Sequence, residues 1–383
     1  MLYEDKPISD EELAHWLAFS VLSGVGPKRV ATLEERLNSM VTAWKAPSTV
    51  LRRLPNFGEE TVAAIEAGRK EIDPFKLLQD LRKTGIQALT WNDPHYPLKL
   101  RHIADPPVVL YVNGDMRHEY LTNAVAIVGT RRPTSYGEKN AKEVSNGLAM
   151  HGVTIVSGLA TGIDSIAHWG AIDGGSPTIA VLGSGPDVCY PTSNQRLFNT
   201  ILEDGKGAIV SEYFPGTLPE KFRFPARNRV ISGLCQALLV VEGGEDSGSL
   251  ISANMAFDQS REVFAIPGRN DSVMSAGPNK LIKQNKAHLC TSYEDILTEL
   301  NWVKTKVGPN REQPAVVALY GREREIYDII SHESVHFDSM IEQTGMAAGE
   351  LSATLTMLEL AGLVSRDAGD WYSRKNDVTV GNR

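Results

Sequence analysis

Six short apolar runs between residues 124 and 297, separated by helical stretches, most constrain how this chain can fold. Each run is rich in β-branched residues and apolar on both faces, as strands of a parallel sheet are when helices cover both sides. Helical stretches such as Gly137–Met150 and Gly248–Gln259 fall between them. The pattern predicts a Rossmann-like α/β domain with a doubly wound, mostly parallel sheet. Its strands are Ala124–Val128, Val153–Val156, Thr178–Leu182, Ala208–Val210, Ala237–Val241 and Glu262–Ile266.

The segments on either side of this pattern predict further domains. Leu22–Leu33 and Leu54–Ile65 share a glycine-containing turn before a helix. Such turns form either a helix-hairpin-helix that grips a DNA phosphate or a sterile-alpha-motif-like helical bundle. The C-terminal part has the pattern of three helices and a hairpin, which indicates a winged helix. The expected parts are a helical domain at 1–75, the Rossmann-like domain at 76–300, a polar linker at 301–315 and the winged-helix domain at 316–383.

Composition limits the function further. The 383 residues are 42% hydrophobic and 22% charged, which excludes a disordered chain, a collagen and a coiled-coil rod. A net charge of −8 excludes a uniformly basic nucleic-acid coat but leaves room for a local basic pocket. The three cysteines form no CxxC pair, so no zinc site or disulfide scaffold is indicated. With an acidic, polar N-terminus and no membrane-length apolar run, we expect a cytoplasmic protein without metal or cofactor.

The loops that directly follow the strands carry anion-binding residue types. Ligands of an open parallel sheet bind at this edge, where strands end and helices begin. Glycines and hydroxyls suit a close approach to phosphate, and arginines supply cationic forks. The GxGxxG dinucleotide fingerprint is missing from the first loop. The loops therefore predict a site for a phosphate-rich ligand at Gly129, Arg131, Arg132, Ser157, Gly158, Thr161, Arg196, Ser247, Gly248 and Ser249.

The segment Phe222–Gly233 narrows the ligand class. It crowds three arginines, two phenylalanines and Asn228 into twelve residues. Guanidinium groups beside aromatic faces suit an unpaired polynucleotide, because charge holds the backbone and flat rings stack on the bases. An interior cluster of ion pairs with core phenylalanines is the alternative. The candidates here are Phe224, Arg227, Asn228 and Arg229.

Two features could instead indicate chemistry. Asp164 and His168 lie at positions i and i+4 of one helix, so they could form an acid/base pair or a hydrogen-bonded support for the loop. Cys189 has no histidine near it in sequence, which favours a packed side chain over a nucleophile. We expect no catalytic residue.

Together, the ordered motifs resemble the DNA-processing protein A (DprA, or Smf) family. They are VGTRRPTSYG, SGLATGIDSIAHWGA, TIAVLGSG, FPARNRVISGL, VVEGGEDSGSLISA, VFAIPGR and GPNKLIK, between about Leu77 and Leu297. The resemblance implies a non-enzymatic protein that binds and protects single-stranded DNA and loads RecA recombinase during natural transformation. It also implies a homodimer formed through the Rossmann-like domain. Arg131, Arg227, Arg229 and Lys283 fall on matching family positions, which adds Lys283 to the candidate DNA-binding residues.

Other classes of function fit less well. A Rossmann-like phosphoribohydrolase places a catalytic glutamate beside a Gly-Gly-x-Gly-Thr loop, but here Leu250 follows Gly243–Ser249 and no glutamate comes soon after. An NAD(P) oxidoreductase is disfavoured by the missing fingerprint. Arg322–Lys375 holds ten acidic and five basic residues, so we expect the winged helix to contact protein or to regulate, not to dock on duplex DNA.

Overall fold

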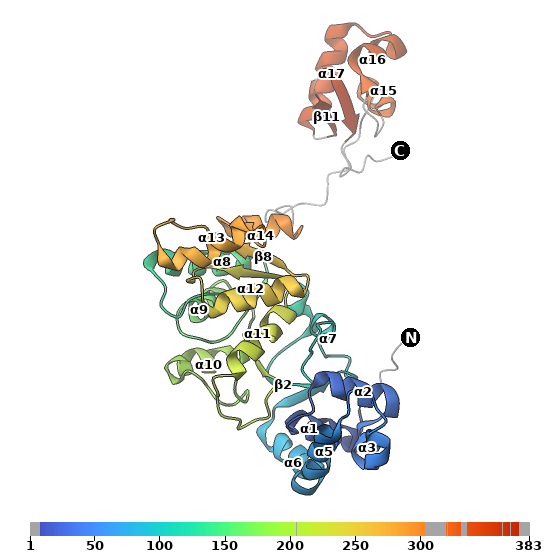
Figure 1. Cartoon of the computed structure of the whole chain (residues 1–383). Coiled ribbons are helices and arrows are strands. Elements are labelled where there is room, and N and C mark those ends of the chain that lie inside the picture. The colour runs from blue at the N-terminus through green and yellow to red at the C-terminus, as the bar shows by residue number, and fades with distance from the viewer. Residues whose placement is uncertain are drawn as a thin grey trace. The chain divides into compact units, whose positions relative to one another are not determined.

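The computed structural model describes residues 8–203, 205–302, 319, 321–330, 335–361, 363–367 and 369–374. They fall into two compact units, Met1–Val303 and Lys304–Arg383 (Figure 1). The linker expected at 301–315 lies almost wholly outside the described residues.

A nine-stranded sheet forms the centre of the first unit, in the order β1-β2-β6-β5-β4-β3-β7-β8-β9. From β6 to β9 every neighbouring pair is parallel, which confirms the predicted Rossmann-like fold. At the other edge, β2 pairs antiparallel with both β1 and β6. The strands are β1 (Gln87–Thr90), β2 (Val109–Gly114), β3 (Ala124–Val128), β4 (Thr154–Ser157), β5 (Thr178–Leu182), β6 (Gly207–Ser211), β7 (Ala237–Val240), β8 (Glu262–Ala265) and β9 (His288–Leu289).

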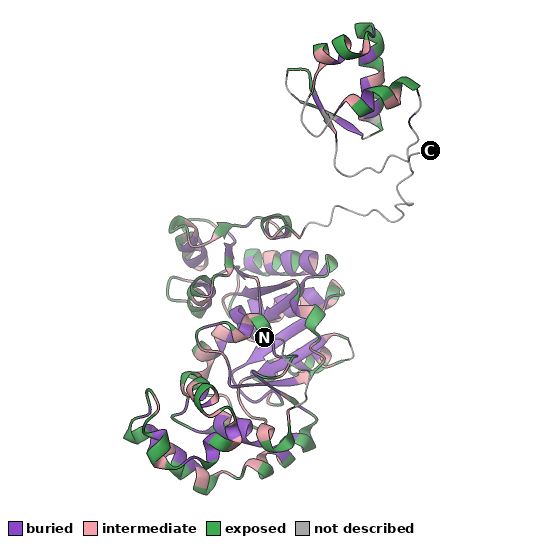
Figure 2. Cartoon of the chain, turned by 90° about the vertical axis from the view of Figure 1, so that its right-hand side faces the viewer, coloured by how far each residue is buried: buried purple, intermediate pink, exposed green. Residues whose placement is uncertain are grey.

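Helices cover both faces of this sheet, as the doubly apolar strands predict. Along β3, Ala126 and Val128 join a core with α11 and α12, whereas Val125 and Ile127 join a core with α8, α9 and α14. The strands are accordingly buried in Figure 2, and the outer faces of the helices are exposed. The helices are α7 (Leu98–Arg101), η1 (His118–Leu121), α8 (Ser135–Met150), α9 (Ile163–Asp173), η2 (Thr192–Asn194), α10 (Gln195–Ile201), α11 (Arg223–Gly233), α12 (Gly248–Asp258), α13 (Val273–Lys283) and α14 (Tyr293–Glu299).

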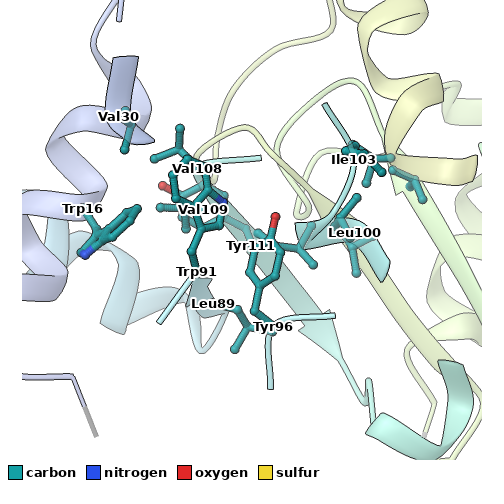
Figure 3. Close-up of a cluster of buried hydrophobic side chains, with 14 of the residues drawn as sticks. Trp16, Val30, Leu89, Trp91, Tyr96, Leu100, Ile103, Val108, Val109 and Tyr111 are labelled. Carbon is teal, nitrogen blue, oxygen red and sulfur yellow. The ribbon is translucent and has the colours of Figure 1, made fainter. Parts of the chain in front are cut away.

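The N-terminal helices pack against the antiparallel edge of the sheet. Trp16 meets Trp91 edge-on with ring centroids 5.5 Å apart, and the Ser20 and Tyr111 hydroxyls are 2.8 Å apart (Figure 3). The helices and the sheet therefore share one core. The helical part also continues beyond residue 75, because α6 packs on α1. Its helices are α1 (Asp10–Val21), α2 (Pro27–Leu37), α3 (Met40–Lys45), α4 (Ser48–Leu51), α5 (Glu59–Glu71) and α6 (Pro74–Thr84).

The second unit has the three helices and the hairpin expected of a winged helix. A third short strand completes its sheet, in the order β10-β12-β11. Its own core includes Ile326, Met340, Leu351 and Leu355. The elements are α15 (Gly321–Ile329), β10 (Val335–His336), α16 (Phe337–Thr344), α17 (Ala348–Leu360), β11 (Val364–Asp367) and β12 (Trp371–Arg374).

Candidate nucleic-acid interface

A cavity of about 540 Å³ opens where the strand order reverses, between β3 and β7. The chain leaves β3 toward β4 on one side and returns to β7 on the other, so the loops after these strands part here. Such a switch point is where ligands of doubly wound sheets bind. The lining residues are Val128, Gly129, Thr130, Arg131, Ala160, Asp164, Tyr190, Lys221, Phe224, Pro225, Arg227, Asn228, Ile231, Ser247, Gly248, Ser249, Ile251 and Ser252.

Arg227 is the buried cation of this cavity. Its Nη1 donates to the carbonyl oxygens of Gly158, at 2.8 Å, and Val181, and its Nε donates to Asn228 Oδ1 at 3.2 Å. Burial lowers the pKa of Arg227 to about 10, so the guanidinium stays charged at neutral pH. A Cβ on Gly158 would overlap the guanidinium, which explains a glycine at that position. Arg227 is therefore a fixed positive charge in the cavity wall.

The loop after β4 is held by Asp164, at the start of α9. Its Oδ2 accepts hydrogen bonds from the backbone N–H groups of Gly158, at 3.1 Å, and Ala160, at 3.4 Å. Leu159 between them has a left-handed φ of 57°, which is unusual for a branched side chain. Burial raises the pKa of Asp164 above its ordinary value, against the attraction of Arg227. Of the two alternatives for Asp164, these contacts match the support of the loop.

Aromatic rings and exposed cations form the rim. Tyr190 and Phe224 stack with centroids 5.4 Å apart, and the Arg131 guanidinium lies 5.9 Å from the Phe224 centroid. Arg131 and Lys221 are exposed. Sequence reasoning missed Lys221 and Tyr190. Lys221 lies just before the arginine-rich segment, and Tyr190 lies in the loop after β5. Ligands of a parallel sheet bind in the loops that follow its strands, which we call the strand-end rule. Applying this rule to every side chain of the loop after β5 could have found Tyr190.

The N-terminus of α12 closes the remaining side. Ser247 caps the helix by accepting a hydrogen bond from the Ser249 N–H at 3.3 Å, and the two hydroxyl oxygens are 2.8 Å apart. Serine is among the residues that most favour this N-cap position. The positive end of the helix thus faces the same cavity as Arg227.

The structure brings together ten of the fifteen candidate residues at this place. Eight line the cavity itself, and Gly158 and Thr161 line a smaller adjoining cavity of about 70 Å³ that shares Arg131 and Arg227. Ser157 is buried, and its hydroxyl donates to the Ile127 carbonyl at 2.6 Å, tying β4 to β3. The exposed Arg132, Arg196 and Lys283 line neither cavity. The eight are Gly129, Arg131, Phe224, Arg227, Asn228, Ser247, Gly248 and Ser249.

Arg229 lies away from the cavity and is held by acidic residues. Its two terminal nitrogens donate to the Glu212 carboxylate at 2.7 and 2.8 Å, and its Nε donates to the Asp105 carbonyl at 2.8 Å. Burial alone lowers the pKa of Arg229, but the hydrogen bonds and charge of Glu212 outweigh burial and raise it. For this arginine, the structure matches the alternative of an interior ion pair.

His168 is buried in α9 and serves as a neutral hydrogen-bonding group. The Thr178 hydroxyl donates to the Ile155 carbonyl at 2.7 Å, so His168 Nδ1 donates to that hydroxyl, also at 2.7 Å. The other ring nitrogen is buried without a hydrogen-bond partner among the described residues. Burial lowers the pKa of His168 to about 3. Asp164 and His168 thus bond to different groups.

His168 should make the fold sensitive to mild acid. The unfolded histidine takes up a proton below its ordinary pKa of 6.5, whereas the folded one does so only near 3. The unfolded state therefore binds more protons in this window, and about 2 kcal/mol of unfolding free energy is lost between pH 6.5 and 5. Urea denaturation at pH 7 and pH 5 measures this loss. His168→Asn keeps a donor near Nδ1 and should lose distinctly less, and an equal loss in both proteins would contradict the assignment.

The carboxylates beside the cavity are engaged in holding its loops. Glu242, buried at the end of β7, accepts hydrogen bonds from the Thr134 N–H at 2.9 Å and hydroxyl at 2.6 Å. Asp164 is engaged as described above. A general acid or base needs a carboxylate within reach of a substrate proton, and neither geometry favours the hydrolase alternative. Cys189 points its sulfur at the Pro191 carbonyl, 3.4 Å away, and burial raises the pKa of its thiol.

The described residues contain no group of three or more His, Cys, Asp or Glu side chains that could hold a metal ion. Among the helices described, none is long and apolar enough to cross a membrane.

The sheet and its cavity define a Rossmann-like α/β protein with a cationic switch-point site and an appended winged helix. Residues 87–301 match the family model of DNA recombination-mediator protein A, and residues 310–370 match the DprA winged helix domain. The chain belongs to the DprA/Smf family.

Known relatives agree with this assignment over most of the chain. Protein Smf of Synechocystis is 35% identical over 96% of this chain and 100% of its own length. DprA of Bacillus subtilis is 39% identical over 67% of this chain and 88% of its own. The crystal structure of Streptococcus pneumoniae DprA superimposes with a TM-score of 0.66 at 36% identity, covering 77% of this chain and 99% of that one. A Helicobacter pylori DprA structure, described for its single-stranded DNA binding mode, has a TM-score of 0.51 at 32% identity, covering 56% and 95%.

Proposed function

We propose that this protein binds single-stranded DNA in the switch-point cavity and loads RecA recombinase on it during DNA uptake and recombination. The observation that carries the proposal is the meeting of a buried arginine, exposed cations, a helix N-terminus and stacked aromatic rings at one edge of the sheet. Membership in the DprA/Smf family supports it, as does the H. pylori relative described as binding single-stranded DNA.

Each wall of the cavity has a part in this proposal. Arg131, Lys221 and Arg227 neutralise phosphates, and the N–H groups at Gly248 and Ser249 hold one phosphate closely. A base stacks on the Phe224–Tyr190 pair, and the exposed Phe222 offers a further ring outside the cavity. Stacking tolerates every base, so sequence preference is slight. In a duplex the base faces are covered, and the cavity therefore favours unpaired DNA.

The remaining parts of the proposal concern partners. We propose RecA as a partner, and a homodimer formed through the Rossmann-like domain, on the strength of the family resemblance. Two cavities on one strand would raise avidity. The winged helix contacts protein in this proposal. Its helix α17 contains no lysine or arginine, and Ser352, Ala353, Thr356 and Met357 are exposed along it. A helix that docks on duplex DNA needs cations against phosphates.

Arg131→Ala tests the function directly. The side chain is exposed, so its removal should leave the thermal midpoint unchanged while weakening single-strand binding about tenfold at low salt. Titration of fluorescent oligo-dT and of duplex at two salt concentrations measures this. Arg132→Ala, which removes the same charge one residue away and outside the cavity, is the control and should lose much less. Equal affinity of wild type and Arg131→Ala, or preference for duplex, would refute the proposal.

A further inference from the structure

A second groove adjoins the cavity across the outer face of α12. It has a volume of about 330 Å³ and lies between α12 and the C-terminal half of α13. Ser247 and Ile251 line both the groove and the cavity, so the two are contiguous along the first turns of α12. Ile251 between them is 42% exposed. A chain that leaves the cavity over Ile251 therefore enters this groove.

Two lysines line the groove from the α13 side. Lys280 is exposed on the last turns of the helix, and Lys286 follows the helix end. The turn that ends α13 fixes the backbone of Lys286. The Lys286 N–H donates to the Leu281 carbonyl at 3.0 Å, and Asn285 before it takes a left-handed φ of 53°. Lys286 Nζ then donates to Asn254 Oδ1 at 3.2 Å, which orients it across α12. Both cations thus lie beside the path that leaves the cavity.

The groove carries its own competing anions. Glu245 and Asp246 line it, and Glu245 Oε2 lies 3.6 Å from Lys280 Nζ. This pair is 64% and 46% exposed on its two side chains, and such surface pairs exchange partners easily. A strand phosphate arriving from the cavity can therefore take the place of the Glu245 carboxylate. The affinity of the groove for a strand therefore depends on how easily a phosphate replaces Glu245 at Lys280.

We propose that the groove between α12 and α13 binds the next segment of the same single strand, with Lys280 and Lys286 as its phosphate contacts and Glu245 as the internal competitor. This inference rests on the proposed function. A strand is the occupant that the contiguity favours, because its charges repeat along a flexible backbone and one molecule can fill both places. An acidic protein segment would need only the groove.

Oligonucleotides of two lengths distinguish binding in the groove from binding in the cavity. Full-length protein is titrated with fluorescent oligo-dT of about five nucleotides, which the cavity alone can hold, and of about fifteen, which reaches the groove. Lys280→Ala/Lys286→Ala should weaken binding of the long oligonucleotide about tenfold and reduce its salt slope by about 1.4. The short oligonucleotide should bind as it does to wild type. Lys139→Ala/Lys142→Ala is the matched control, since both are exposed lysines of α8 that line neither space.

A variant that is expected to strengthen binding completes the test. Glu245→Gln removes the competitor and should strengthen binding of the long oligonucleotide about threefold, again with the short one unchanged. Equal losses in the groove variant and in Lys139→Ala/Lys142→Ala, losses shared by both lengths, or an unaltered long-oligonucleotide affinity would each overturn the groove assignment while the cavity assignment stood. Failure of wild type to bind either length would overturn the proposed function, and this inference with it.

Discussion

Arg227→Ala is expected to reduce single-strand affinity roughly a hundredfold, because it removes a buried positive charge of the cavity wall that the proposed function assigns to a strand phosphate. The same change leaves the carbonyls of Gly158 and Val181 without their donor and Asp164 without its neighbouring cation. We therefore expect a loss of about 3 kcal/mol in the free energy of unfolding as well. Urea denaturation and oligo-dT titration below the unfolding range measure the two losses separately.

Arg227→Lys distinguishes the loss of charge from the loss of fold. Lysine keeps one positive charge but cannot donate to two carbonyls and Asn228 as the planar guanidinium does. This variant should retain the salt slope of wild type and recover only part of the stability. Wild-type affinity in the folded alanine variant would remove Arg227 from the binding site.

The parallel part of the sheet could be predicted because its strands are buried on both faces. Continuous β-branched runs such as Thr178–Leu182 and Ala124–Val128 match β5 and β3 residue for residue. The strands at the two ends of the sheet carry no such signal. Gln87–Thr90 is four residues long with its first residue exposed, and the two residues of β9 are both exposed, so neither has a pattern to detect. Strand β2 runs antiparallel to both of its neighbours, and periodicity does not report the direction of a strand.

The candidate site could be predicted as far as the strand-end rule reaches. That rule selected candidates from the loops after β3, β4 and β7. Those after β3 and β7 include lining residues of the larger cavity, whereas Gly158 and Thr161 after β4 line the smaller one. The rule could not predict that Arg227 faces the cavity and Arg229 does not. That difference arises because both arginines lie on helix α11. Residues two apart on a helix point about 200° away from each other, so one arginine faces the cavity and the other faces Glu212. Assigning the arginine-rich segment to a helix would have predicted this division.

Arg229 should therefore matter for stability far more than for binding. Arg229→Ala leaves the Glu212 carboxylate, whose side chain is only 18% exposed, without its two guanidinium hydrogen bonds. Breaking one side of such a pair costs about 3–5 kcal/mol, and chemical denaturation should register a loss of that size. Glu212→Gln/Arg229→Gln removes both charges at once and should recover much of it, because neither partner is left buried and uncompensated.

The double variant also tests whether Arg227 serves binding and Arg229 serves stability on helix α11. Because Glu212→Gln/Arg229→Gln leaves Arg227 and the cavity lining in place, it should bind oligo-dT with near wild-type affinity and an unchanged salt slope. A stable double variant whose salt slope falls by about 0.7, the value for one phosphate contact on a single strand, would return Arg229 to the binding surface. Helix α11 would then contact DNA from both of its sides. The ion pair with Glu212 opposes this outcome, because a guanidinium already bonded to a carboxylate must give up that partner before it can bind a phosphate.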